Sequence, residues 1–167
     1  AIAERCRLLR SHGQPERYTH TMLGFNFRMT EMAAAIGLGQ LGRLTEFNRQ
    51  RIDNARILTE AIKDLKGLEP PFIAPRVKHV FHQYTVRVKP SFRHSRDGLR
   101  SYLEERGIGS AVHYPIPIHR QPYYLGLGYR DSLPVAEEAS QEVLSLPVHP
   151  GLVAEDLQRM IEALSNG

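Results

Sequence analysis

Apolar residues recur every three or four positions along a stretch that begins after Thr30 and ends at Gly67. This spacing predicts one long helix, straight or bent, because residues spaced in this way share one face of an α-helix. Thr30 is a suitable N-cap, and Glu31 follows it in the first turn, where an acidic residue is favourable. The apolar positions that set the pattern are 41, 44, 52, 55, 58, 62 and 65.

The first third of this predicted helix has unusually small side chains. Alanine occupies positions 33, 34 and 35, and glycine occupies positions 37, 39 and 42. Each glycine costs roughly 1 kcal/mol inside a helix, so three of them predict that another backbone packs very close. The pattern leaves open whether this neighbour is another helix, a cofactor domain or a second subunit.

A shorter helix is predicted at the start of the chain. Ile2, Cys6 and Leu9 share one side of a helical pattern, which ends at Gly13, a residue that can adopt the left-handed conformation. Residues 14–23 have no helical or alternating period, and they are predicted to form a surface loop.

The second half of the chain alternates strands and helices. The expected elements are a strand at 84–88, a helix from Ser95 or Arg96 to Arg106 that Gly107 ends, a second strand from Ile108 to Tyr114, an aromatic, glycine-rich loop at 123–129, and helices at 134–144 and 154–164. This order predicts an α/β fold in which helices cover a small sheet.

Length and composition fit an ordinary globular domain. The chain has 167 residues, of which 41% are apolar and 24% charged. No run of about 18 apolar residues is present to span a membrane. The single cysteine, Cys6, cannot form an internal disulfide, and we therefore expect a reducing, cytoplasmic environment.

The net charge of +4 reflects eighteen arginines and four lysines against eighteen acids. The planar guanidinium group suits carboxylate and phosphate ligands. Nucleic-acid binding through Arg5, Arg7 and Arg10 is an alternative that predicts strongly salt-dependent affinity. Acidic residues interleaved with the basic ones argue against it.

Asn26 and Arg28 directly precede the predicted long helix. Unpaired N–H groups and the positive end of the helix dipole favour an anion there, and both side chains can donate hydrogen bonds to it. The alternative for this pair is an Asn that satisfies a turn and a surface Arg.

His113 and Tyr114 end the second predicted strand, next to prolines that stiffen the exit. Side chains at such a position can point into a cleft, and core packing of Tyr114 is the alternative. His79 and His82 have an HxxH spacing, but residues three apart on a strand point to opposite faces, so we expect no metal site.

Several segments of the chain resemble, in order, the DegT/DnrJ/StrS family of pyridoxal-phosphate-dependent sugar aminotransferases. They are Leu8-Leu9-Arg10-Ser11-His12-Gly13, Gly24-Phe25-Asn26-Phe27-Arg28-Met29-Thr30-Glu31, Phe81-His82-Gln83-Tyr84, Val112-His113-Tyr114-Pro115-Ile116-Pro117 and Ser145-Leu146-Pro147. The resemblance implies that Asn26 reaches the cofactor phosphate of the other subunit of a homodimer, with Arg28 near the same anion. It also implies that His113 and Tyr114 line the sugar-nucleotide pocket.

In this family the lysine that binds the cofactor lies upstream of the helix with which this sequence opens. The chain begins with Ala1, inside a helical pattern, so we expect it to be the C-terminal part of a longer enzyme. A complete small protein trimmed at its N-terminus is the alternative. The resemblance assigns residues 1–29 to the large cofactor-binding domain, 30–66 to a connecting helix and 67–167 to the small C-terminal domain of a fold-type I aminotransferase.

The expected activity of the full-length protein is transfer of an amino group from an amino acid, with glutamate the expected donor, to a nucleotide-linked keto-sugar. This chain alone is expected to be inactive, because none of its four lysines lies in a motif like the Schiff-base position. The alternative from another functional class is a non-catalytic regulator or binding module with the same fold. No nucleic-acid or membrane partner is expected.

Overall fold

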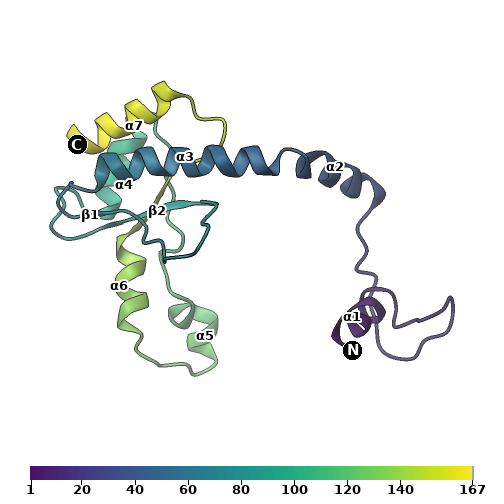
Figure 1. Cartoon of the computed structure of the whole chain (residues 1–167). Coiled ribbons are helices and arrows are strands. Elements are labelled where there is room, and N and C mark those ends of the chain that lie inside the picture. The colour runs from purple at the N-terminus through teal and green to yellow at the C-terminus, as the bar shows by residue number, and fades with distance from the viewer. Residues whose placement is uncertain (167) are drawn as a thin grey trace. The chain divides into compact units, whose positions relative to one another are not determined.

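The computed structural model describes residues 1–166, and the chain forms two compact units, Ala1–Leu44 and Thr45–Gly167. The helices and strands follow along the chain as labelled in Figure 1: α1 (Ile2–Arg10), α2 (Glu31–Leu41), α3 (Leu44–Ile62), β1 (Leu68–Glu69), β2 (Tyr84–Val88), α4 (Arg96–Glu104), the 3-10 turn η1 (Ile118–Arg120), α5 (Pro122–Gly126), α6 (Pro134–Glu142), β3 (Val143–Leu146) and α7 (Ala154–Asn166).

In the first unit, the chain leaving α1 pairs with the segment that leads to α2. His12 N donates to Phe25 O at 2.8 Å, and Phe27 N donates to Arg10 O at 2.9 Å. Gly24 allows this close approach, because a Cβ added there would lie 1.9 Å from the backbone N of Gly13. The two segments are therefore fixed to each other, and Asn26 lies within this pairing, opposite Ser11.

The predicted long helix is present as α2 and α3, which are separated at Gly42 and Arg43. Thr30 is the N-cap of α2, as predicted, and its side chain accepts a hydrogen bond from Ala33 N at 3.2 Å. No residue of α2 is buried within the chain. Among the described residues, no atom lies within 4 Å of a Cβ added at Gly37 or Gly39, so the first unit itself supplies no close neighbour at these two glycines.

In the second unit, the three strands form an antiparallel sheet in the order β1-β2-β3. Tyr84, Val86 and Val88 alternate with exposed or half-buried positions along β2, as the sequence pattern predicted. The register places Tyr84 opposite Leu146 and Thr85 opposite Ser145. One face of the sheet is therefore apolar, and the other carries polar side chains, among them Thr85, Arg87 and Ser145.

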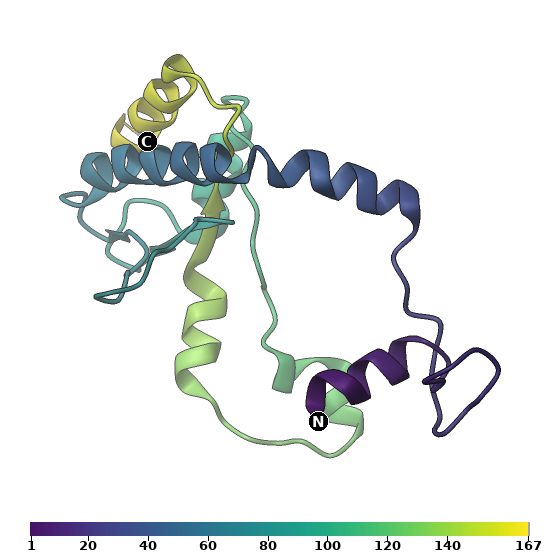
Figure 2. The same ribbon diagram turned by 45° about the vertical axis from the view of Figure 1, so that its right-hand side comes forward.

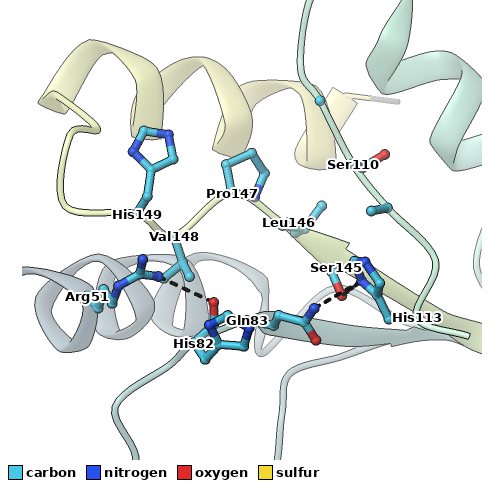
Figure 3. A pocket seen from close by; sticks show the side chains of 12 residues that line it. Arg51, His82, Gln83, Ser110, His113, Ser145, Leu146, Pro147, Val148 and His149 are labelled. Carbon is cyan, nitrogen blue, oxygen red and sulfur yellow. Dashed lines mark hydrogen bonds between the residues drawn. The ribbon is translucent and has the colours of Figure 1, made fainter. Parts of the chain in front are cut away.

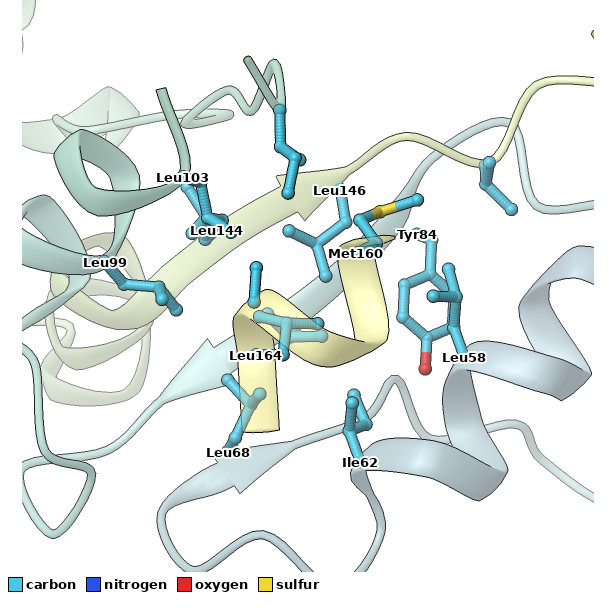
Figure 4. Packing of buried hydrophobic residues seen from close by; sticks show 14 of the residues in the cluster. Leu58, Ile62, Leu68, Tyr84, Leu99, Leu103, Leu144, Leu146, Met160 and Leu164 are labelled. Carbon is cyan, nitrogen blue, oxygen red and sulfur yellow. The ribbon is translucent and has the colours of Figure 1, made fainter. Parts of the chain in front are cut away.

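Helices α3, α4 and α7 bury the apolar face of the sheet. Figures 1 and 2 show α7 beside α3, and Figure 4 shows their side chains meeting those of the strands. Leu58 and Ile62 of α3 are fully buried, and so are Leu99 of α4 and Leu164 of α7. Burying a side chain of this size contributes roughly 1.5–3 kcal/mol, so this cluster holds the unit together.

A buried carboxylate ties α6 to the sheet. Glu142 at the end of α6 receives hydrogen bonds from Arg87 Nε at 2.7 Å and from Lys89 Nζ at 2.9 Å. Bonding to Glu142, and then to Glu138, raises the pKa of Lys89. This network fixes the direction in which α6 leaves the sheet.

The prediction of a strand from Ile108 to Tyr114 was wrong. Within it only Ala111 pairs with a neighbour, exchanging two hydrogen bonds with Ser145. The third strand is β3, and the sequence pattern had wrongly predicted its first two residues as the end of a helix at 134–144. Its Leu144, Ser145 and Leu146 are all buried, and burial against the sheet overrides the helical pattern that continues from α6.

Two smaller expectations also need correction. The glycine-rich segment expected as a loop at 123–129 contains the short helix α5, which begins at Pro122, a residue well suited to the first turn of a helix. His79 and His82 precede β2 rather than lying on a strand. Within residues 1–166, none of the helices combines the length and apolar character that crossing a bilayer requires.

Candidate functional site

The first candidate site lies where the chain enters α2. Arg28 donates from Nε to Oδ1 of Asn26 at 2.7 Å, and both side chains are exposed. The pairing of residues 24–27 with the end of α1 holds the backbone of Asn26 in place. The two residues predicted to hold an anion are thus brought together.

The donors of this pair fit one part of a phosphate site. Because Oδ1 of Asn26 is occupied by Arg28, the amide Nδ2 and the terminal guanidinium nitrogens face solvent as donors. The N-terminus of α2 offers fewer free N–H donors to an anion than the sequence suggested, because Ala33 N already donates to the hydroxyl of Thr30. Two side chains on an exposed surface give only part of the enclosure that a bound small molecule requires.

The second candidate site is a polar pocket in the second unit, which we call the histidine pocket (Figure 3). It has a volume of about 360 Å³. Its lining contains three histidines, one arginine and no acidic residue: Arg51, His82, Gln83, Gly109, Ser110, Ala111, His113, Ser145, Leu146, Pro147, Val148 and His149.

His113 lies at the centre of a hydrogen-bonded group in this pocket (Figure 3). Its Nδ1 is 3.2 Å from Nε2 of Gln83 and 3.3 Å from Oγ of Ser145. These three residues come from three of the family-like segments, which are far apart in the sequence. The fold therefore gathers those segments around one imidazole.

The third candidate site is an apolar cleft between the segment after His113 and helix α6. Its volume is about 880 Å³, and its lining residues are mostly aliphatic and aromatic: His113, Tyr114, Ile116, Pro117, Ile118, His119, Gln121, Tyr124, Tyr129, Leu133, Ala136, Ala139, Ser140 and Val143. Ala136 and Ala139 of α6 line this cleft. A cleft of this size, with few polar groups among apolar ones, is typical of a small-molecule site.

Tyr114 is 74% exposed, which rules out core packing for it within this chain. It lines the apolar cleft, and His113 lines both this cleft and the histidine pocket. Two residues predicted from sequence to face a cleft therefore do so.

Sequence reasoning missed a carboxylate in a pocket that adjoins the apolar cleft and shares Ile116, Pro117 and Ser140 with it. Oε1 of Glu137 lies 3.0 Å from Nε2 of His119 and 3.0 Å from Nη2 of Arg120. The hydrogen bond from His119 and the one from Leu133 N lower the pKa of Glu137 to about 2. The available signal was an acidic residue one turn after Pro134, since acids near a helix start often accept from backbone N–H groups.

The same architecture occurs in solved sugar aminotransferases. The structure of S. venezuelae DesV in complex with a ketimine intermediate matches with a TM-score of 0.91 and 38% identity, over 99% of this chain and 43% of that one. Helicobacter pylori PseC, an aminotransferase involved in pseudaminic acid biosynthesis, matches with a TM-score of 0.87 and 27% identity, over 99% of this chain and 45% of that one. The fold is therefore that of the C-terminal part of such enzymes.

Residues 1–165 match the DegT/DnrJ/EryC1/StrS aminotransferase family, and the chain belongs to this family. A dTDP-3-amino-3,4,6-trideoxy-alpha-D-glucose transaminase of Streptomyces venezuelae is 38% identical over 98% of this chain and 42% of the relative. A pleiotropic regulatory protein of Geobacillus stearothermophilus is 41% identical over 98% of this chain and 44% of the relative. The chain thus spans less than half the length of these curated relatives.

Proposed function

We propose that this chain is the C-terminal region of a pyridoxal-phosphate-dependent aminotransferase. The full-length enzyme would move an amino group from an amino acid, with glutamate the expected donor, to a keto group on a nucleotide-linked sugar. The observation that carries the proposal is the family match over residues 1–165, together with relatives named as transaminases of dTDP-sugars. Exposed Cys6, a free thiol, fits a reducing cytoplasm as the location.

In this proposal, residues 1–29 complete the large cofactor-binding domain, 30–66 connect it to the small domain, and 67–167 form the small domain. Pyridoxal phosphate supplies the electron sink for amino transfer. Asn26 and Arg28 donate hydrogen bonds to its phosphate in the other subunit of a homodimer, since their paired side chains present donors to solvent. The active sites would therefore be shared between subunits.

Substrate binding is assigned to His113 and Tyr114 and to the apolar cleft that they line. The ring of Tyr114 offers an apolar face and a hydroxyl donor, a combination that suits a sugar linked to a nucleotide. Gln83 and Ser145 orient the imidazole of His113 through Nδ1. The protein's contribution at this site is to orient the substrate.

A second candidate function is supported by the names of two relatives. The 41% identical protein of Geobacillus stearothermophilus is called a pleiotropic regulatory protein, and a 36% identical protein of Saccharopolyspora erythraea is called a sensory transduction protein. A regulator with the same fold could keep the cleft and lack the lysine that bonds the cofactor.

The test uses the full-length protein with pyridoxal phosphate, glutamate and a nucleotide-linked keto-sugar, and measures the aminated product by mass spectrometry. Turnover, together with cofactor bonded to a lysine upstream of Ala1, is the expected result. Failure of the cofactor to bond to any upstream lysine, with nucleotide-sugar binding retained, would favour the regulator.

The 167-residue chain alone is the matched control. It is expected to bind pyridoxal phosphate weakly and to show no turnover, because the cofactor lysine and the enclosing domain are missing. Stoichiometric borohydride trapping at Lys63, Lys66, Lys78 or Lys89, together with turnover, would contradict this assignment.

A further inference from the structure

One carboxylate oxygen, in the pocket that adjoins the apolar cleft, joins three donors from two parts of the chain. Oε1 of Glu137 accepts from His119 Nε2, Arg120 Nη2 and the backbone N of Leu133, each at 3.0 Å. His119 and Arg120 belong to η1, which follows Tyr114 along one wall of the cleft. Glu137 belongs to α6, which forms the opposite wall.

The wall that η1 forms contacts the following helix α5, and its side-chain hydrogen bonds to α6 go to Glu137. Ile118 of η1 is 71% exposed, so η1 is not anchored in the core through that side chain. Gln121 donates from Nε2 to Ile116 O at 3.3 Å, a bond that lies within the same segment. The imidazole of His119 is the exception, with only 9% of its side chain exposed, and it is bonded to Glu137. The hydrogen bonds from His119 and Arg120 to Glu137 therefore join the wall formed by η1 to α6.

We propose that Glu137 is a positioning residue that holds the wall formed by residues 114–121 against α6 and so sets the width of the apolar cleft for its nucleotide-sugar substrate. This inference rests on the proposed function for the identity of the substrate. The carboxylate itself bonds to the wall and to the start of α6.

An ionised carboxylate is acceptor-only and makes stronger, charge-assisted hydrogen bonds than a neutral amide does. The Glu137→Gln side chain has nearly the same shape and keeps one oxygen that can accept the bonds now made to Oε1, but it carries no charge. The bonds from His119 and from the guanidinium of Arg120 should therefore be weaker in this variant. The variant weakens the clamp with little change in side-chain volume.

Glu138→Gln is the matched control. Glu138 is the next residue of α6, it is also ion-paired, and its partners are Lys89 and Arg87 rather than η1. The control therefore loses a charge and an ion pair on the same helix while the clamp stays intact. His119→Phe is a second test variant, which keeps a ring in the cleft wall and removes the donor to Glu137.

The first measurement is amide hydrogen exchange in the full-length protein. Exchange at Leu133 and at Arg120 and Gln121, whose amides are bonded inside the turn, should accelerate by roughly fivefold or more in Glu137→Gln, since local opening follows the loss of local bonds. Glu138→Gln should match the unaltered protein at these amides. Unchanged exchange in Glu137→Gln and His119→Phe overturns the clamp.

The second measurement is steady-state kinetics of the same proteins. For Glu137→Gln, KM for the nucleotide keto-sugar should rise by about fivefold, with kcat changed less than about twofold and KM for the amino donor unchanged. A general loss of stability would not produce this split between the two substrates. Faster exchange with an unchanged KM for the nucleotide sugar overturns the role in substrate positioning.

The two proposals fail in different ways. No turnover by the unaltered full-length protein overturns the proposed function, and with it the substrate assigned to the cleft. Amide hydrogen exchange at Leu133 does not depend on turnover. If the unaltered protein shows no turnover, this exchange alone decides whether Glu137 clamps the wall.

Discussion

Arg28 and Asn26 form one hydrogen-bonded unit, with Nε of Arg28 donating to Oδ1 of Asn26 at 2.7 Å. The bond fixes the amide so that Nδ2 is turned away from Arg28. Both exposed side chains keep further donors, and the backbone that carries Asn26 is held by pairing with the end of α1. Loss of Arg28 would free the amide of Asn26 as well as remove a charge.

The shared-site proposal predicts complementation between two inactive proteins. Asn26→Ala and a variant lacking the cofactor lysine should each be inactive or nearly so in the full-length enzyme. Mixed dimers should regain activity, because one of their two composite sites carries neither change. Activity of co-purified heterodimers with two different affinity tags measures this. Heterodimers that form and stay inactive would show that Asn26 acts within its own subunit.

Substitution of the glycines of α2 should affect subunit assembly and helix stability in opposite ways. Replacing Gly37 or Gly39 with Leu should increase helix stability by roughly 1 kcal/mol, since glycine is a poor helix former, and no atom of the first unit lies within 4 Å of a Cβ added at either position. If another subunit or domain covers this face, the added bulk should prevent its close approach. Ultracentrifugation of the full-length protein measures its assembly. The control is Arg56→Leu, which places a leucine at an exposed position of α3. Unchanged assembly in both glycine variants would remove the packing role.

The elements that sequence predicted best are those whose signals are local. Thr30 is an N-cap as predicted, and the helix expected from Ser95 or Arg96 begins at Arg96 with Ser95 as its N-cap. Each of the two side chains accepts a hydrogen bond from a backbone N–H in the first turn of its helix. The pattern of β2 is also local, because alternation records which side faces the core. β3 was missed because its strand character depends on pairing with β2, about sixty residues earlier in the chain.

Tyr84 of β2 makes another long-range contact, with helix α3, and this contact leads to a stability prediction. Its buried hydroxyl lies 2.9 Å from Oγ1 of Thr59 on α3, and burial raises the pKa of the phenol. Tyr84→Phe should lower the free energy of unfolding by about 1 kcal/mol, the usual net value of one hydrogen bond. Tyr84→Ala should cost about 3–5 kcal/mol through the cavity that it leaves.

Urea unfolding monitored by circular dichroism measures both changes. Thr59→Val is the matched variant on the other side of the bond, and a double variant should cost less than the sum of the two single ones, because the same bond is removed. Strict additivity would mean that the two hydroxyls do not stabilise each other.

The candidate sites were only partly visible in the sequence. His113 and Tyr114 were found because prolines follow them, and the structure places both at the cleft. Glu137 was not found, since its partners His119 and Arg120 lie eighteen and seventeen positions earlier, respectively, and are joined to it only by the fold. Local sequence patterns can identify residues at the end of a helix or strand. A carboxylate that joins two walls of a cleft can be identified only from the tertiary structure.

The last prediction concerns the response of the cleft to acid. The hydrogen bond from His119 is the largest cause that lowers the pKa of Glu137, from 4.5 to about 2. A carboxyl whose pKa is lowered by folding binds its proton more weakly in the folded state than in the unfolded state. Its contribution to stability is therefore fully present above the unfolded value of 4.5, and it is lost as pH falls through the folded value of about 2.

A carbon-detected NMR titration of the Glu137 carboxyl should accordingly give a midpoint well below 4.5, and His119→Phe should move this midpoint upward. Lys89→Met is the matched control, because Lys89 is bonded to Glu138 and Glu142 and not to Glu137. It should raise the pKa of Glu138, whose lowering Lys89 causes, and leave the midpoint of Glu137 unchanged. An equal midpoint for Glu137 in His119→Phe and in the unaltered protein would mean that the imidazole does not bond to this carboxylate in solution, and that η1 is held to α6 by other contacts.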